Sequence, residues 1–303
     1  MKPTIFSIIQ KNIPLLINDN SAVEYKYIPL HSKPLPSLKK LSQVVDLFRS
    51  IIFPGYYGDT AIDNDTLAYH MGVNLERLYN LLRDQVQNGL CFNATEDQCI
   101  ESQKLAPEIA KSLINKLPEL KRIVSTDIKA TFDSDPAAKS YGEVIFCYPT
   151  IRAVFNYRIA HELLKLGVPV IPRVITELAH SETGIDIHPN AKIGEYFSID
   201  HGTGVVIGET SVIGNHVRLY QGVTLGAKRF TLGEDGNPLN VPRHPILEDN
   251  VVVYANANIL GRITIGRDSI IGGNVWLTNS VPAGSRILQQ KAIVSSFFDG
   301  LGI

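Results

Sequence analysis

Aliphatic residues recur at every sixth position along the second half of the chain, between residues 187 and 277. A period of six fits neither the 3.6-residue turn of an α-helix nor the two-residue alternation of a half-buried strand. It fits a short flat strand followed by a corner, repeated many times, which is typical of a hexapeptide β-helix. The repeating positions are Ile187, Ile193, Ile199, Ile207, Ile213, Leu219, Leu225, Leu247, Val253, Ile259, Ile265, Ile271 and Leu277.

Three such repeats complete one triangular coil, so each coil stacks on the next at a strand spacing of about 4.8 Å. The aliphatic side chains then point inward and form one continuous core, as in other solenoids. Thirteen aliphatic positions, three to a coil, predict slightly more than four coils.

The repeat is interrupted at two places. The first interruption adds two residues after Ile199, within Asp200-His201-Gly202-Thr203-Gly204. The second lengthens the connection that follows Leu225, and it ends in Arg243-His244-Pro245. Solenoids often carry their functional residues where the repeat is broken. Because each interruption contains a histidine, we expect the chemistry of this protein at these two connections.

Before the repeat, apolar residues follow a helical spacing, and Gly or Pro ends several of the runs. Residues 1–35 are polar and contain several prolines, so we expect a loosely held arm there. The pattern predicts helices at about 37–52, 74–88, 102–130, 150–166 and 172–180. The predicted fold class is α+β and multidomain, with an all-helical N-terminal domain over 1–180, a parallel β-helix over 181–288 and a flexible tail over 289–303.

Composition narrows the range of functions. Lys and Arg number 29 against 30 Asp and Glu, for a net charge of −1, so no nucleic-acid partner is indicated. Polar residues at 10–12 interrupt the apolar N-terminal segment, which therefore predicts neither a signal peptide nor a membrane span. The cysteines have no metal-site spacing and are typical of a reduced cytoplasmic protein; they are Cys91, Cys99 and Cys147.

Several segments together resemble the serine acetyltransferases, which make O-acetylserine from serine and acetyl-CoA for cysteine biosynthesis. The resemblance is dense over residues 184–281 and looser before them, where the Asp135-Pro136-Ala137 segment also matches. It implies a left-handed β-helix, although parallel crossovers are normally right-handed. The matching segments are Ile185-Asp-Ile-His-Pro-Asn-Ala-Lys-Ile-Gly194, Asp200-His-Gly-Thr-Gly-Val-Val-Ile-Gly-Glu-Thr210, Gly222-Val-Thr-Leu-Gly226 and Arg243-His-Pro245.

Acetyl transfer to a hydroxyl needs a base that is neutral at working pH, and histidine suits that task. His201, in the first interruption, is the candidate catalytic base. The resemblance implies that Asp186 is its carboxylate partner, which would fix the tautomer and stabilise the imidazolium. The alternative is that His201 only occupies a coil corner. His188, close to Asp186 in sequence, is read as a corner residue or a proton-positioning one.

The resemblance also implies a serine site. Arg243 and His244 would bind the serine carboxylate, since a guanidinium recognises a carboxylate with two parallel hydrogen bonds. Asp200 and Asp135 would hold the ammonium group, with Pro136 shaping the loop. The alternatives are a solvated Arg-His loop and an Asp-Pro pair that merely ends a helix.

Coenzyme A would run along Gly226, Ala255 and Gly273, where small residues let the pantetheine arm approach the backbone. Tight coils also need small residues at such positions, so that reading stays open. After Pro282 the chain lacks the family segment that closes over coenzyme A, and its connection 227–243 is longer than usual. The resemblance implies acetyl-CoA as a substrate and no metal. The two departures affect only the individual contacts with coenzyme A.

The resemblance further implies a homotrimer or a dimer of trimers, feedback inhibition by cysteine, and binding of O-acetylserine sulfhydrylase through the C-terminal Ile303. Two rival readings remain. One is a sugar or other small-hydroxyl acetyltransferase. The other is a zinc enzyme like the γ-carbonic anhydrases, with His201, His216 and His244 as ligands, although their spacing does not suit it.

Overall fold

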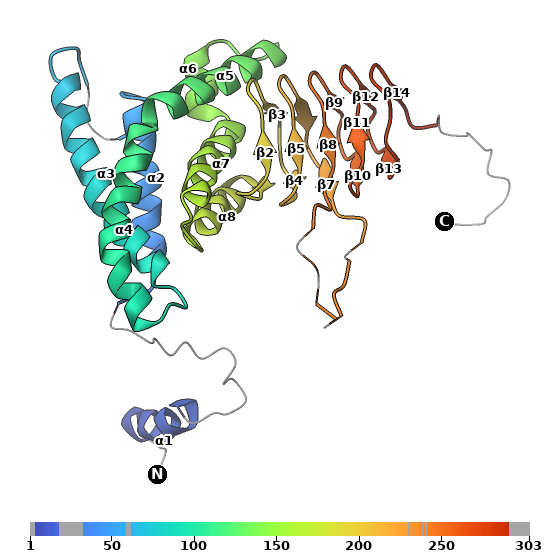
Figure 1. Ribbon diagram of the computed structural model, residues 1–303. Coiled ribbons are helices and arrows are strands. Elements are labelled where there is room, and N and C mark those ends of the chain that lie inside the picture. Colours follow the sequence, from blue (N-terminus) through green and yellow to red (C-terminus); the bar gives the residue numbers. More distant parts are fainter. Residues whose placement is uncertain are drawn as a thin grey trace.

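A computed structural model describes residues 4–17, 33–58, 62–229, 231–234, 236–237, 239 and 241–290. Helices occupy the first part of the chain and short strands the second (Figure 1). The tail predicted over 289–303, with Ile303, lies almost wholly outside the described residues. The helices are α1 (Ile5–Ile17), α2 (Leu38–Ile52), α3 (Leu67–Leu90), α4 (Glu96–Asn115), α5 (Leu117–Ser134), α6 (Tyr141–Cys147), α7 (Pro149–Lys165) and α8 (Ile171–Thr183).

The helices predicted near α2, α3, α7 and α8 are confirmed, but the prediction for residues 102–130 is wrong. The single helix predicted over 102–130 is two helices, because α4 ends at Asn115 and Pro118 lies in the first turn of α5, where proline is tolerated. The arm predicted over 1–35 contains helix α1, whose apolar side chains are exposed. Helix α6, which begins after the capping residue Ser140, was not predicted.

The strands form three parallel sheets, one on each side of a β-solenoid (Figure 1). Sheet A contains β1 (Asp186–Ile187), β4 (Val206–Ile207), β7 (Thr224–Gly226), β10 (Asn258–Leu260) and β13 (Trp276–Leu277). Sheet B contains β2 (Lys192–Ile193), β5 (Val212–Ile213), β8 (Ile246–Leu247) and β11 (Thr264–Ile265). Sheet C contains β3 (Ser198–Asp200), β6 (Arg218–Tyr220), β9 (Val252–Val253), β12 (Ile270–Ile271) and β14 (Arg286–Ile287).

The register of the strands confirms the six-residue period. Ile187 pairs with Ile207, and Ile207 pairs with Leu225, so the aliphatic positions stack in columns. They are buried except at Ile193 and Leu277, which are only partly buried. Strand β14 lies beyond Leu277, the last predicted position, so the solenoid has about five coils rather than slightly more than four.

Helix α7 joins the helical part to the solenoid. The hydroxyl of Tyr157 donates a hydrogen bond to the Ala191 carbonyl at 2.6 Å, and the Tyr157 ring belongs to the core of the solenoid. Beside it, the guanidinium of Arg158 binds both carboxylate oxygens of Asp127 at 3.1 Å, from helix α5. Arg158 also donates to the Ile193 carbonyl at 2.7 Å. Through these contacts, helices α5 and α7 pack on the first coil of the solenoid.

The cysteines differ from the expectation of three reduced thiols. Cys91 and Cys99 form a disulfide, and Cys147 is free and exposed. The pair is brought together because Cys91 follows the end of α3 and Cys99 lies in the first turn of α4, across a short connection. Among the described helices, none combines the length and apolar character needed to cross a membrane.

Candidate active site

Two edges of sheet A carry the predicted site residues. We call CA edge the corners between sheets C and A, at residues 201–205, 221–223, 254–257 and 272–275. We call AB edge the corners between sheets A and B, at residues 188–191, 208–211, 227–245, 261–263 and 278–280. The first interruption of the repeat is therefore on the CA edge and the second on the AB edge. The described parts of the long connection 227–245 extend away from the coils (Figure 1).

At the CA edge, His201 is accompanied by two carboxylates. The Nε2 atom of His201 lies 3.8 Å from a carboxylate oxygen of Asp200, and the His201 side chain is 75% exposed. Asp135, just beyond α5, accepts a hydrogen bond from the Tyr148 hydroxyl at 2.6 Å. This bond and the Ala137 N–H hold the pKa of Asp135 below its usual value, with a further contribution from His201. The CA edge thus presents an imidazole beside two acids.

The backbone of His201 has φ 58°, in the left-handed region. Left-handed conformations of non-glycine residues often mark functional sites. Here, however, His216 (φ 56°), Asn256 (φ 59°) and Asn274 (φ 58°) adopt the same conformation at other corners. The positive φ is therefore a property of the coil corner, and what distinguishes His201 is an exposed imidazole beside the carboxylate of Asp200.

At the AB edge, Arg243 forms an ion pair with Glu209, and both side chains are largely buried. The Thr210 hydroxyl accepts hydrogen bonds from the backbone N–H groups of Arg243 at 2.8 Å and His244 at 3.0 Å. Arg262 donates to the carbonyls of Thr210 and His244. This network fixes the end of the long connection against the preceding coil.

His244 is 7% exposed and held in one protonation state. Its Nδ1 atom accepts a hydrogen bond from the Thr210 N–H at 3.1 Å, so the neutral ring carries its proton on Nε2. Burial and the nearby Arg243 lower the pKa of His244 to about 4. A side chain at Gly208 would meet Nε2 at 2.2 Å, so glycine is required there. His244 is thus a neutral hydrogen-bond donor.

Asp186 and His201 are not brought together within one chain. Asp186 lies in β1 and faces Arg173 of α8, at 3.7 Å. Within the described part of a single chain, it makes no hydrogen bond or ion pair with His201. His188 belongs to the AB edge, where burial lowers its pKa and Glu209 opposes that shift. The predicted residues therefore form two half-sites, separated by sheet A, which is about 10 Å wide for a three-residue strand.

The three positions predicted for coenzyme A also divide between the edges. Ala255 and Gly273 lie in successive corners of the CA edge, where the Asn274 N–H donates to the Ala255 carbonyl at 2.9 Å. Gly226 ends β7 at the AB edge. Next to it lies a hollow of about 270 Å³, whose lining among the described residues includes four cationic side chains and no acid; the four are Lys228, Arg229, Arg243 and Arg262.

Two groups of side chains bear on the alternative that the protein is a zinc enzyme. His201, His216 and His244 lie at three different corners of the triangle, so they cannot ligate one metal within a single chain. In the described residues, Glu177, His180 and Asp186 do approach one another within 4.8 Å. Arg173 makes ion pairs with both of those carboxylates and so competes with a cation for them. We assign no metal to them.

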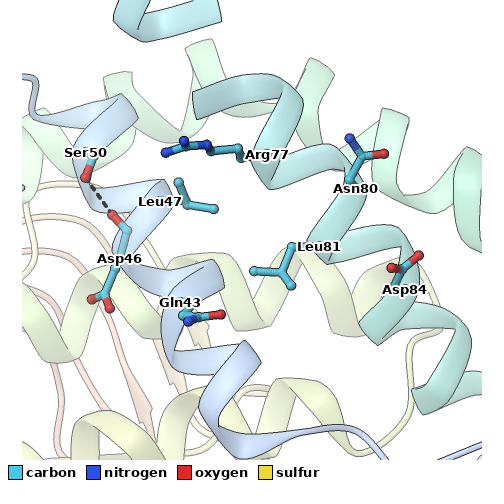
Figure 2. Close-up of a pocket in the computed structure, with 8 residues that line it drawn as sticks. All are labelled: Gln43, Asp46, Leu47, Ser50, Arg77, Asn80, Leu81 and Asp84. Carbon is cyan, nitrogen blue, oxygen red and sulfur yellow. Dashed lines mark hydrogen bonds between the residues drawn. The ribbon is translucent and has the colours of Figure 1, made fainter. Parts of the chain in front are cut away.

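One groove is remote from both half-sites. It measures about 610 Å³ and lies between α2 and α3, where Leu47, Leu81, Asp46 and Arg77 are among its lining residues (Figure 2). None of the predicted site residues lines it. Its position in the helical part gives no reason to connect it with the chemistry of the two edges.

Sequence reasoning did not single out Tyr148, Glu209 or Thr210. Glu209 and Thr210 meet the end of the second interruption only in the folded chain, because Arg243 is 34 positions away from Glu209 along the sequence. Tyr148 precedes a proline at the start of α7 and resembles an ordinary helix-capping position. No periodic signal in the sequence marks these partners.

Comparisons with known proteins agree on one family. A family model of the bacterial transferase hexapeptide repeat matches residues 244–279. The chain is 48% identical over 276 residues to a plasmid serine acetyltransferase of Synechococcus elongatus, covering 89% of this chain and 86% of that protein.

Solved structures give the same result. Serine acetyltransferase isoform 3 of Entamoeba histolytica, in complex with cysteine, is similar with a TM-score of 0.71 and 30% identity, covering 97% of this chain and 96% of that one. Serine acetyltransferase 1 of the same organism, in complex with L-cysteine, has a TM-score of 0.70 and 34% identity, covering 93% and 97%.

Proposed function

Because the chain belongs to the serine acetyltransferase family and is an acyltransferase that acts on serine, we propose that its two half-sites combine into one catalytic site. The observation that supports this proposal is the exposed imidazole at the CA edge together with a partly buried cation and a neutral imidazole donor at the AB edge. The exposed imidazole of His201 belongs to the CA edge, and the guanidinium that can bind a carboxylate, that of Arg243, belongs to the AB edge.

His201 acts as the general base. It removes the proton from the serine hydroxyl as the oxygen attacks the thioester carbonyl of acetyl-CoA. The new bond joins the serine oxygen to the acetyl carbon, the carbon–sulfur bond breaks, and the proton on His201 passes to the departing thiolate. Asp186 stabilises the imidazolium in the combined site. No enzyme nucleophile is needed because the substrate brings its own hydroxyl.

Serine is held at both ends. Arg243 binds its carboxylate, and Glu209 keeps the guanidinium oriented. The Nε2–H group of His244 donates to the same carboxylate, which its neutral state allows at working pH. Asp135 and Asp200 bind the ammonium group at the CA edge, and Pro136 constrains the loop that carries Asp135.

Assembly supplies the missing half-site. In a ring of three chains, a heterologous contact joins the CA edge of one chain to the AB edge of the next. That contact brings His201 of one chain toward Arg243, His244 and Asp186 of its neighbour. We therefore favour a homotrimer, which could pair into a dimer of trimers through the helical part.

Coenzyme A binds along the same contact. Ala255 and Gly273 line the CA edge in the coils that follow His201, so the pantetheine arm can lie against their backbone and deliver the thioester to His201. Gly226 and the exposed cations Lys228 and Arg229 line the facing AB edge and suit the phosphate groups. This arrangement compensates for the family segment missing after Pro282.

Three further assignments accompany the site. Cysteine has the ammonium and carboxylate groups of serine, so it competes for Arg243 and Asp135; the two Entamoeba relatives were solved with cysteine. The C-terminal Ile303 docks into an O-acetylserine sulfhydrylase. The proposed place of action is the cytoplasm.

An acceptor panel tests the function. Purified enzyme and acetyl-CoA are incubated with serine, O-methylserine or a galactoside, and free thiol and acetylated product are both measured. We expect thiol release and O-acetylserine with serine alone, because O-methylserine offers the same charges without the attacking hydroxyl. Thiol release with galactosides and none with serine would overturn the proposal.

A further inference from the structure

A tyrosine that the mechanism does not use lies beside the proposed ammonium site. The hydroxyl of Tyr148 donates to the Oδ2 atom of Asp135 at 2.6 Å, and the Ala137 N–H donates to Oδ1 at 2.8 Å. Each carboxylate oxygen therefore has one partner and keeps free lone pairs. The Asp135 carboxylate is fixed in direction without being saturated.

The position of Tyr148 is itself fixed. Its ring packs against the core of the helical part, and Pro149 follows it at the start of α7. One residue further, the Thr150 hydroxyl donates to the Ile199 carbonyl at 2.7 Å, which attaches the start of α7 to β3. Because Asp200 follows Ile199, this attachment sets the distance between the two proposed ammonium ligands.

The charges around the Tyr148 hydroxyl agree with this arrangement. The Asp135 hydrogen bond, with smaller effects from Glu143 and Asp200, raises the pKa of Tyr148 to about 12. The hydroxyl thus keeps its proton at any working pH and always donates. The same bond lowers the pKa of Asp135, so the carboxylate is ionised when serine arrives.

We infer that Tyr148 is a positioning residue for serine: it holds the Asp135 carboxylate toward Asp200 and so sets the affinity for the substrate ammonium group. The inference deepens the proposed function and rests on the assignment of Asp135 to that group. Tyr148 touches no reacting atom, so it acts on serine binding and leaves the chemical step unchanged.

The test is the variant Tyr148→Phe, which keeps the ring and removes the hydroxyl. We expect the serine KM to rise about tenfold, as for the loss of a hydrogen bond to a charged group, with kcat and the acetyl-CoA KM unchanged. Tyr57→Phe is the matched control, because the Tyr57 hydroxyl donates at 2.6 Å to the Ile145 carbonyl of nearby α6. It should lower the unfolding temperature and leave the serine KM unchanged.

A double-mutant cycle separates this inference from the proposed function. Asp135→Ala should raise the serine KM, and adding Tyr148→Phe should raise it no further, because Tyr148 acts through Asp135. If Asp135→Ala has no effect, the assignment of Asp135 fails, and the role of Tyr148 fails with it. If Asp135→Ala raises the serine KM but Tyr148→Phe does not, or if the two effects simply add, only the inference about Tyr148 is overturned.

Discussion

At the scale of single residues, three histidines with different surroundings have different properties. His201 is exposed at the CA edge, so solvent and substrate reach its imidazole. Burial of His244, together with the neighbouring Arg243, lowers the pKa of its imidazole to about 4, so the ring is neutral. His216 stacks on Tyr196 at 4.4 Å, at a corner away from both half-sites. Only the first combines exposure with neighbouring acids.

Replacing the base should stop the chemistry and spare coenzyme A binding. His201→Ala should lower kcat by roughly 10²- to 10⁴-fold, the usual cost of losing a general base, because the other basic groups at the CA edge, Asp135 and Asp200, are assigned to the ammonium group of serine. Steady-state thiol release measures kcat, and titration with acetyl-CoA measures binding. His216→Ala is the matched control, since His216 shares the same left-handed corner conformation. A near wild-type rate for His201→Ala would refute the assignment.

At the scale of elements, helix α7 determines how the site is built. The start of α7 places Thr150, and the capping residue Tyr148 just before it, at the CA edge. The middle of the helix places Tyr157 and Arg158 against the first coil. The Arg158 and Asp127 side chains are 8% and 1% exposed. Burial raises the pKa of Asp127 to about 6, and the attraction of Arg158 opposes that rise. Because this value still lies below neutral pH, the Asp127 carboxylate is ionised there and pairs with the Arg158 guanidinium.

Breaking this buried pair should weaken the junction. Asp127→Asn leaves the Arg158 guanidinium buried without a counter-charge, and we expect the free energy of unfolding in urea to fall by about 3–5 kcal/mol. Asp133→Asn, on the same helix, removes an exposed partner of Lys129, and such pairs contribute about 1 kcal/mol or less. Equal losses for the two variants would show that the Asp127 pair has no special role.

At the scale of the whole molecule, the two half-sites face away from each other across sheet A. A single chain therefore holds the proposed base, His201, on one edge and the proposed carboxylate-binding group, Arg243, on the other. If trimers join these edges, each catalytic site contains residues from two chains, and a chain damaged at one edge still contributes its other edge.

Subunit mixing tests this arrangement. His201→Ala and Arg243→Ala should each be almost inactive alone. After the two variants are unfolded and refolded together in equal amounts, about a quarter of the sites should pair an intact CA edge with an intact AB edge. Activity should therefore return to roughly that fraction of wild type. Each variant refolded alone is the control. No gain on mixing would place the whole site within one chain.

The amino-acid sequence determined the solenoid and indicated the two connections at which we propose its chemistry. A six-residue aliphatic period sets the strand, the corner and the inward-facing column by local geometry alone, so the stacking of Ile187, Ile207 and Leu225 could be predicted. The two interruptions of that period identified the segments around His201 and Arg243 in the same way.

The tertiary structure decided what each of these residues touches. The division into two half-sites depends on which corner of the triangle each segment occupies. The neutral state of His244 comes from burial and from Thr210, and the fixed carboxylate of Asp135 comes from Tyr148. Such contacts join residues with no shared periodicity, so they arise only when coils and helices pack together. A repeat fixes local conformation, but charge and hydrogen bonding depend on neighbours that the folded chain alone supplies.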